Sequence, residues 1–206
     1  MSAHTIVTLT GASCSGKTTL AKALGEAGMA TIRSFTTRPI RTGEVDGVDY
    51  DFRSKLWVSE QAAKGRLIEC NRFNGCLYGI SVDNVEEAMR RGNVLLKIVD
   101  PNGARALRHW ANGRFQVYAI LLDAPVQVLT QRLLQRSAPD MAANSAYYAA
   151  RLKTLIEEEA SWSQPENWPG YDAVYDNVLP GDLGWIAGRI LKDLLPSSSA
   201  TSLMAA

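Results

Sequence analysis

The sequence predicts an α/β protein built on a parallel sheet, and three features support this. Short apolar runs alternate with amphipathic segments, which is the pattern of strands joined by crossover helices. A glycine-rich motif lies between the first apolar run and the first helical segment. A hairpin-like pair of strands interrupts the alternation in the middle of the chain. We therefore expect a three-layer fold with an inserted small subdomain over residues 34–83.

The first half of the chain shows clear element boundaries. The first strand, Thr5–Gly11, is an apolar run that ends in glycine, and a helix follows over residues 16–28. A second helix is expected to begin after Ser54, a suitable N-cap, and to end before Gly65. Two short strands then surround Asn74-Gly75, a dipeptide typical of a two-residue hairpin turn. These signals predict strand, helix and hairpin in that order.

The second half returns to the alternation of strands and helices. A helix capped by Ser81 is expected first. The predicted buried strands are Asn93–Asp100, Phe115–Asp123 and Tyr171–Val178. The predicted helices cover residues 104–111, 125–136, 145–162 and 182–195. Residues 137–144 are expected to form a loop, and residues 196–206 a disordered tail.

Composition excludes several classes of function. The chain has 206 residues, which fits one domain with small subdomains, and its net charge of +1 gives no general attraction to nucleic acids or membrane surfaces. No apolar run is long enough to span a bilayer, and the N-terminus lacks the cleavage pattern of a signal peptide. We expect a cytoplasmic location, with the three cysteines present as reduced thiols.

The glycine-rich motif predicts a binding site for a nucleoside triphosphate. Residues 11–18 read GASCSGKT, which is the P-loop pattern, placed between a predicted strand and a predicted helix. Its glycines let backbone N–H groups face a phosphate, Lys17 reaches the β- and γ-phosphates, and the Thr18 hydroxyl is a ligand for Mg²⁺. This predicts the fold of P-loop NTPases and ATP as one substrate. The ATP-binding candidates in this segment are Gly11, Ser13, Cys14, Ser15, Gly16, Lys17, Thr18 and Thr19.

A polar stretch, Ser34–Phe52, predicts a second phosphate site. Arg38 and Arg41 lie three residues apart, and arginine forks bind phosphate oxygens in bidentate fashion. Tyr50 and Tyr78 add phenolic donors at the ends of strand-like segments. A phosphate bound here would be separate from the one held by the glycine-rich loop.

Four segments, in this order along the chain, resemble guanylate kinases. They are SFTTRPIRTGEVDGVDYDF, LIECNRFNGCLYG, RLLQR and YDAVYDN. The resemblance covers about residues 5–195. It implies one guanylate-kinase-like domain over residues 1–195, with a core of residues 1–33 and 84–195. It also implies a nucleoside-monophosphate-binding subdomain over residues 34–83 and a helical lid over about residues 136–151.

The resemblance also assigns roles to individual residues. The acceptor nucleotide would be bound by Ser34, Arg38, Arg41, Tyr50, Glu69, Tyr78, Gly79 and Asp100. Ser34 would donate to guanine O6, and Glu69 would accept from guanine N1–H and the 2-amino group. The catalytic cations would be Lys17, Arg38, Arg132, Arg136 and Arg151. Asn177 would contact adenine, and Asp100 would hold Mg²⁺ through water.

The sequence departs from the family pattern at several positions. Ile98 stands where an acid is usual, and Ile80 stands where a serine or threonine helps to read guanine. The stretch between Arg136 and Arg151 is longer than expected, and Gln135 and Ser137 replace the usual lid glycines. Lys97, in a predicted buried strand, is interpreted as snorkelling or as paired with an acid.

The resulting expectation is transfer of the γ-phosphoryl group of ATP to GMP or dGMP, with Mg²⁺, by a monomer or homodimer that binds neither nucleic acid nor membrane. One alternative is a kinase for a deoxynucleotide or a modified purine monophosphate, in a specialised or phage pathway. A second is a non-catalytic binding module, which in this family usually lacks the P-loop lysine or the lid arginines. A third is a sugar-phosphate kinase, which would need no reader of a purine N1–H.

Overall fold

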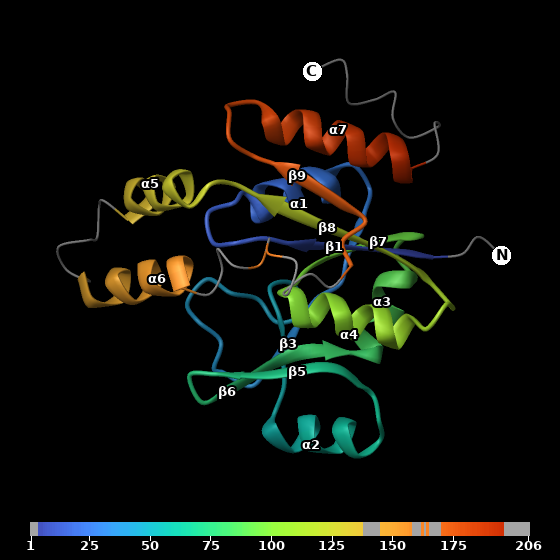
Figure 1. The fold of residues 1–206 in the computed structure, drawn as a ribbon. Coiled ribbons are helices and arrows are strands. Elements are labelled where there is room, and N and C mark those ends of the chain that lie inside the picture. Colours follow the sequence, from blue (N-terminus) through green and yellow to red (C-terminus); the bar gives the residue numbers. More distant parts are fainter. Residues whose placement is uncertain (1–3, 138–144, 158–161, 163, 165–169, 196–206) are drawn as a thin grey trace.

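The structure is a computed structural model, shown in Figure 1, that describes residues 4–137, 145–157, 162, 164 and 170–195. The predicted tail at 196–206 lies outside these residues, as does most of the loop expected at 137–144. The described part contains two sheets, one of five strands and one of four. Within it, every helix is too short or too polar to cross a bilayer.

The five-stranded sheet is parallel throughout, as the sequence predicts. Its order is β2 (Ala30–Thr31), β7 (Val94–Ile98), β1 (Thr5–Thr10), β8 (Gln116–Asp123) and β9 (Ala173–Asp176). The central strand β1 pairs on both sides, with Val7 opposite Leu96 on β7 and Tyr118 on β8. The carboxyl ends of these strands therefore open at a single edge of the sheet.

Helices cover both faces of this sheet (Figure 1). On one face, α1 (Lys17–Glu26) and α7 (Asp182–Leu194) pack against Val7 and Leu9 of β1. On the other face, α3 (Val82–Met89) and α4 (Pro101–Ala111) share a core with Ile6. Side chains of one strand thus alternate between the two cores, which is the expected two-residue period.

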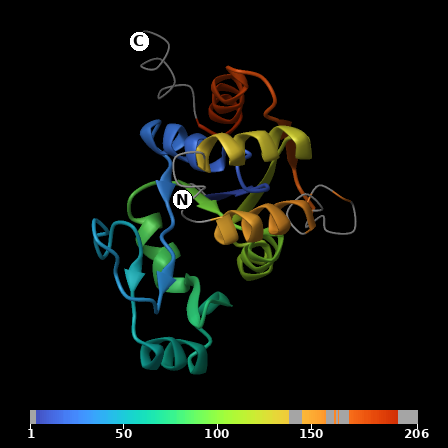
Figure 2. The same ribbon diagram turned by 90° about the vertical axis from the view of Figure 1, so that its left-hand side faces the viewer.

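The four-stranded sheet projects from the core together with α2 (Lys55–Ala63), as Figure 2 shows in a second view. Its order is β4 (Asp51–Phe52), β3 (Phe35–Thr36), β6 (Cys76–Ser81) and β5 (Leu67–Phe73). The hairpin of β5 and β6 turns at Asn74 and Gly75, whose φ angles of 47° and 76° fit a two-residue turn. Ser54 caps α2 by accepting from Trp57 N at 3.0 Å, as its position predicts.

A buried ionic network ties the four-stranded sheet to α3. Asp51 on β4 accepts from Arg33 Nε at 3.0 Å and from the Asn84 side chain, and Arg33 also pairs with Glu87. Ser81 and Asn84 form a capping box at the start of α3. Because Asp51 is 5% exposed, this network fixes the junction between the two sheets.

Two more helices, α5 (Val126–Ser137) and α6 (Ser145–Glu157), lie side by side beyond the end of the five-stranded sheet (Figures 1 and 2). Leu129 and Leu133 of α5 and Leu155 of α6 share a small core with Ala12. The helix pair is thereby seated on the segment that follows β1.

The expected strand Asn93–Asp100 is too long. Strand β7 ends at Ile98, and Asp100 is instead the N-cap of α4, where its Oδ1 accepts from Gly103 N at 2.7 Å. Pro101 fills the first turn of this helix, which begins three residues before the expected start at 104. The alternation of faces along β7 therefore does not extend to Asp100.

We expect Gly79→Ala to lower the free energy of unfolding by about 1–3 kcal/mol, as overpacking does. A Cβ at this position would lie 2.1 Å from the backbone oxygen of Glu69 and 2.6 Å from Phe35 Cζ, so a backbone atom must move. The matched control is Gly188→Ala in α7, where no heavy atom lies within 4 Å of the new Cβ. The control should raise stability by about 0.5–1 kcal/mol in urea unfolding. Equal effects of the two substitutions would contradict the packing at Gly79.

Candidate active site

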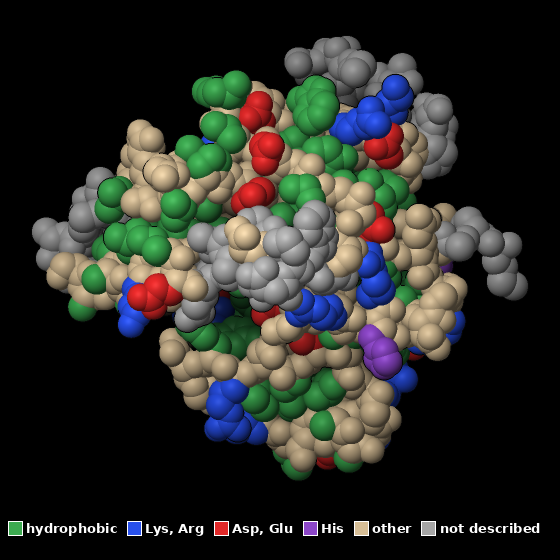
Figure 3. All heavy atoms as spheres, in the orientation of Figure 1, with side chains coloured by type: hydrophobic (Ala, Val, Ile, Leu, Met, Phe, Trp, Pro, Cys, Tyr) green, Lys and Arg blue, Asp and Glu red, His purple; other side chains and the backbone are tan. Residues whose placement is uncertain are grey.

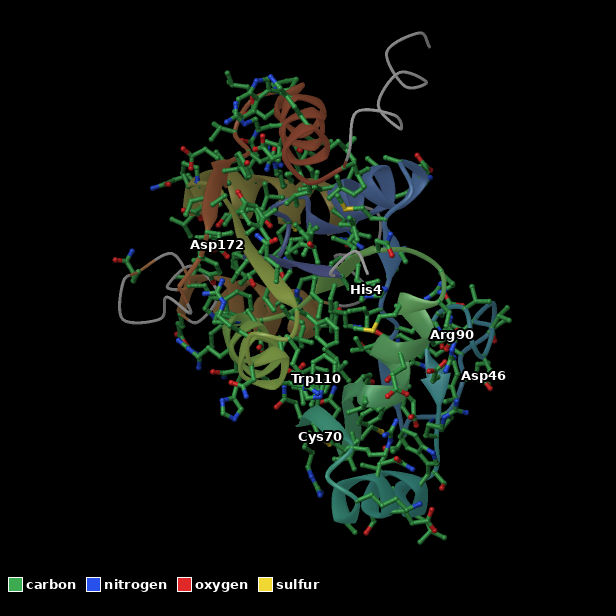
Figure 4. All side chains as sticks on the ribbon, turned by 90° about the vertical axis from the view of Figure 1, so that its right-hand side faces the viewer. His4, Asp46, Cys70, Arg90, Trp110 and Asp172 are labelled. Carbon is green, nitrogen blue, oxygen red and sulfur yellow. The ribbon has the colours of Figure 1, made fainter. Side chains whose placement is uncertain are left out.

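The predicted site residues of the core lie at one end of the five-stranded sheet and not at the other. At the amino end, His4 precedes β1 and Asp172 precedes β9, as Figure 4 shows. Asp172 accepts from Arg108 Nη2 at 2.5 Å and from Ala119 N at 2.7 Å, so it serves the packing of β8 and α4. At the carboxyl end lie the glycine-rich loop after β1, Asp100 after β7 and Asn177 after β9. The predicted site residues from the core therefore gather at one edge.

The glycine-rich loop has the backbone of an anion-binding turn. Cys14 and Gly16 have φ angles of 67° and 99°, and Gly16 is the N-cap of α1 without a side-chain cap. The first N–H groups of α1 are therefore available to a phosphate at the positive end of the helix. The Ser15 hydroxyl is buried and makes no hydrogen bond within the described residues.

The cations of this region are bonded to nearby protein oxygens. Lys17 Nζ donates to Gly11 O at 2.5 Å and to Ala12 O at 2.8 Å, and Arg151 of α6 donates to the Ser13 hydroxyl. Arg132 of α5 donates to the backbone oxygen of Asn177 at 3.0 Å. Arg151 therefore reaches the loop from a helix more than a hundred residues away, as its predicted role requires.

Two adjoining cavities open over this loop. One, of 230 Å³, is lined by Cys14, Gly16, Lys17, Thr18, Thr19, Arg132 and Arg136. The other, of 560 Å³, shares Cys14, Gly16 and Arg132 and extends to Asn177 and to residues 178–183. The Asn177 amide donates to Ser15 O at 2.7 Å and is buried. The structure thus brings together all the predicted ATP-side residues.

The second phosphate site forms on the four-stranded sheet. The buried Arg38 guanidinium carbon lies 5.2 Å from the Tyr50 ring centre, and the Tyr50 and Tyr78 rings are 6.1 Å apart in an edge-to-face arrangement. Three predicted phosphate ligands from distant positions therefore meet. Arg41 differs, because its side chain is exposed and its hydrogen bond to the cluster comes from its backbone N–H.

Glu44 occupies the cationic side of this cluster, which the sequence analysis did not foresee. Its two carboxylate oxygens accept from the two terminal nitrogens of Arg38 at 2.6 Å and 2.5 Å, and one of them also accepts from Arg41 N at 2.9 Å. The Arg38 guanidinium lowers the pKa of Glu44 to about 2. Glu44 thus stays ionised and takes the bidentate position on Arg38 that a phosphate needs.

A third cluster, made of Ser34, Glu69, Lys97 and Asp100, lies where the two sheets meet. Figure 3 shows a recess between the core and the four-stranded sheet on one face of the molecule. Glu69 on β5 accepts from the Asn71 amide at 2.6 Å, and its other oxygen lies close to the start of α4, 2.9 Å from where a Cβ on Gly103 would be. Burial, and then the negative charge of Asp100, raise the pKa of Glu69, while Lys97 lowers it.

Lys97 was predicted to snorkel or to pair with an acid, and both readings are wrong. Its side chain is buried, with the residue 6% exposed, and Nζ donates to Ile32 O at 2.8 Å and to Ser34 Oγ at 2.6 Å. No ion pair within 4 Å joins it to any described carboxylate. Burial lowers its pKa to about 7, against the opposing effects of Glu69 and Asp51.

The two isoleucines that depart from the family pattern lie in different surroundings. Ile98, on the face of β7 opposite to Lys97, is 37% exposed. Ile80 is 1% exposed and belongs to the core formed with α3 and α4. Neither side chain supplies a polar group to the site.

Known proteins resemble this chain along most of its length. A family model described as guanylate kinase matches residues 3–177. A guanylate kinase of Synechococcus sp. is 37% identical over 147 residues, which are 69% of this chain and 78% of that protein. A guanylate kinase of Symbiobacterium thermophilum is 35% identical over 133 residues, 64% of this chain and 62% of that protein. The crystal structure of guanylate kinase from Anaplasma phagocytophilum superimposes with a TM-score of 0.64 at 25% identity, covering 99% of this chain and 93% of that one.

The buried ammonium of Lys97 predicts how stability changes with pH. The pKa of Lys97 is about 7 in the folded protein and 10.5 as its ordinary value, so the unfolded chain binds more protons between these limits. Unfolding therefore becomes less favourable as pH rises through this window. We expect the stability of wild type, relative to Lys97→Met, to increase between about pH 7.5 and pH 9.5 in denaturant titrations. The other titrating groups are common to both proteins, so a difference that does not change with pH would contradict the buried, depressed lysine.

Proposed function

Because this chain belongs to the guanylate kinase family, we propose that it transfers the γ-phosphoryl group of ATP to GMP or dGMP, giving ADP and GDP or dGDP. One observation carries the proposal: the structure holds two separate cationic clusters, one around Lys17 after β1 of the five-stranded sheet and one around Arg38 on the four-stranded sheet. A hydrolase of ATP would need only the first of these clusters. A pair of bound phosphates, one on each side, is what direct transfer between nucleotides requires.

On the donor side, the loop N–H groups and Lys17 would bind the β- and γ-phosphates of ATP. Lys17 would exchange its contacts with Gly11 O and Ala12 O for phosphate oxygens, and the Ser15 hydroxyl would gain a partner. The 560 Å³ cavity that reaches Asn177 is proposed to hold the adenosine. The role of Asn177 is then twofold, because its amide already supports the loop through Ser15 O.

Mg²⁺ is proposed to arrive with the triphosphate. The described residues contain no cluster of three His, Cys, Asp or Glu side chains that could hold a metal alone. The exposed Thr18 hydroxyl at the start of α1 is an oxygen donor of the kind that Mg²⁺ accepts, and Asp100 keeps one carboxylate oxygen beyond its capping bond. Bound Mg²⁺ would offset charge on the phosphate oxygens.

Cations from three directions would stabilise the transferring group. Lys17 comes from the loop, Arg132 and Arg136 from α5, and Arg151 from α6. A phosphoryl transition state spreads its charge over three oxygens, so catalysis depends on positioned positive charge. The proposed lid over about residues 136–151 carries two of these arginines at its ends; residues 138–144 of it lie outside the described part.

On the acceptor side, the phosphate would replace Glu44 on Arg38, and Tyr50 and Tyr78 would donate to it. Glu69 would accept from N1–H and the 2-amino group of guanine, a pair of donors that adenine and sugar phosphates lack. Ser34 would donate to O6. These assignments favour a guanine nucleotide over the sugar-phosphate alternative.

The proposal extends to the subdomains, the cellular location and the oligomeric state of the protein. We propose that residues 34–83 form the acceptor-binding subdomain, which is inserted between the two segments of the core, residues 1–33 and 84–195. We place the protein in the cytoplasm as a monomer or homodimer that binds small nucleotides. The non-catalytic alternative is disfavoured by the retained Lys17, Thr18, Arg132 and Arg136.

The deciding experiment is a coupled ADP-release assay with ATP, Mg²⁺ and a panel of monophosphates. The panel is GMP, dGMP, AMP, dAMP, CMP, dTMP and a 2,6-diaminopurine nucleotide. Turnover on GMP or dGMP and not on the other nucleotides is expected. Turnover restricted to the diaminopurine nucleotide would replace the proposal by the modified-purine alternative. No turnover on any of them, with ATP still bound, would reject the proposed activity.

Arg38→Lys tests the acceptor phosphate site. Lysine keeps the charge but loses the planar fork, so we expect kcat/KM for the acceptor to fall roughly 10- to 100-fold, as when a hydrogen bond to a charged group is lost. The KM for ATP should stay unchanged, because Arg38 lies in the other cluster. The control is Arg66→Lys, since Arg66 pairs with Asp83 and Glu86 at the surface. A change in the KM for ATP, with no change in kcat/KM for the acceptor, would contradict the assignment of Arg38 to the acceptor phosphate.

A further inference from the structure

The contact between Lys97 and Ser34 has a fixed direction. A lysine ammonium has three N–H donors and no acceptor, whereas a serine hydroxyl has one donor and two acceptor lone pairs. In its charged form, Lys97 Nζ can only donate to Ser34 Oγ, which lies 2.6 Å away. Ser34 Oγ then accepts from Lys97, and its own hydrogen is available to a different acceptor.

The surroundings hold both partners in place. Ile32 N donates to Leu96 O at 2.9 Å, and Ser34 O accepts from Asp51 N at 2.9 Å, so the backbone on either side of the contact is hydrogen-bonded. Nζ also donates to Ile32 O at 2.8 Å. Lys97 is 6% exposed, so its Nζ is held among these internal acceptors.

Burial of this ammonium is costly and needs a reason. An ionised ammonium without a carboxylate within ion-pairing distance loses its hydration on burial, and hydrogen bonds to neutral acceptors offset this loss only in part. Here it lies beside Ser34, which the proposed function assigns to guanine O6, and it feels the charge of Glu69, which the same proposal assigns to N1–H. The lysine is thus placed at the part of the pocket that would distinguish one purine from another.

We propose that Lys97 is a positioning residue for base selection: it holds the Ser34 hydroxyl as a donor, so that the pocket accepts a carbonyl and rejects an amino group at C6 of the acceptor purine. This inference rests on the proposed function. It also accounts for Ile80, which brings no hydroxyl to the pocket.

The test compares GMP with 6-thio-GMP, which differs only at C6, where sulfur is a weak hydrogen-bond acceptor. Lys97→Met should reduce the preference for GMP over 6-thio-GMP, measured as the ratio of kcat/KM values, by roughly 10-fold, the effect of one directed hydrogen bond. IMP retains N1–H and O6 but lacks the 2-amino group, so it reports on Glu69. The preference for GMP over IMP should fall less than the preference for GMP over 6-thio-GMP, because Lys97 acts on Glu69 only through its charge, whereas it is hydrogen-bonded to Ser34.

Two further variants tie the effect to Ser34. Ser34→Ala should reduce the same preference, and adding Lys97→Met to it should reduce the preference no further, since both act through one hydroxyl. Lys97→Gln keeps a polar side chain that can present either a donor or an acceptor to Ser34. It should give a smaller loss, and it carries the test if Lys97→Met fails to fold. Lys192→Met, on the exposed end of α7, is the matched control and should leave both ratios unchanged.

The outcomes separate this inference from the proposed function. Turnover of GMP with an unchanged GMP to 6-thio-GMP ratio in Lys97→Met rejects the positioning role and leaves the kinase activity intact. An equal loss of both ratios shows a general distortion of the pocket and also rejects it. A wild-type protein that phosphorylates none of these nucleotides rejects the proposed function and the inference together.

Discussion

The shared direction of the five core strands is the constraint on which the rest of the molecule depends. Since β1 is hydrogen-bonded to β7 and β8 in parallel, the segments that follow these strands must emerge at one edge. The phosphate loop, the Asp100 cap of α4 and Asn177 reach that edge from three strands widely separated in sequence. The helices α5 and α6, which follow β8, then bring their arginines over the same loop. The parallel pairing therefore accounts for the gathering of these polar and charged groups at the carboxyl edge of the five-stranded sheet.

Several cations of the candidate site are hydrogen-bonded to internal acceptors. Lys17 is held by two carbonyl oxygens, Arg132 by the backbone of Asn177, and Arg38 by Glu44. In the proposed function, a bound nucleotide would exchange these contacts for phosphate oxygens, so the gain in each case would be a difference between two sets of hydrogen bonds. Among these acceptors, Glu44 would compete most directly with a phosphate, because its bidentate contact with Arg38 has the geometry of a phosphate contact.

Local signals in the sequence were enough to predict most of the fold. The Asn74-Gly75 turn, the Ser54 and Ser81 caps and the residues 11–18 motif each act within a few positions, and the structure confirms the elements they predict. The misjudged boundary of β7 has a local cause as well, since Asp100-Pro101 is a helix start that an apolar strand obscured. The partners of Arg38, Asp51 and Lys97 were harder to predict. Glu44 is close in sequence but one of several acids in a polar stretch, while Asn84 and Ser34 are brought to Asp51 and Lys97 only by the tertiary fold.

Lys97 and Glu69 illustrate how one buried charge can set the state of another. Burial and the nearby Asp100 both raise the pKa of Glu69, which would favour a protonated carboxyl that could donate but would no longer be a full acceptor. The positive charge of Lys97 opposes this shift and favours the carboxylate, the form that can accept two hydrogens from guanine. Glu69 in turn opposes the loss of the proton from Lys97. The proposed reader of N1–H, Glu69, and the proposed donor to O6, Ser34, are therefore both influenced by Lys97, the first through its charge and the second through a hydrogen bond. A purine that presents donors at N1 and C2 and an acceptor at C6 complements both, and guanine is the common base with that arrangement.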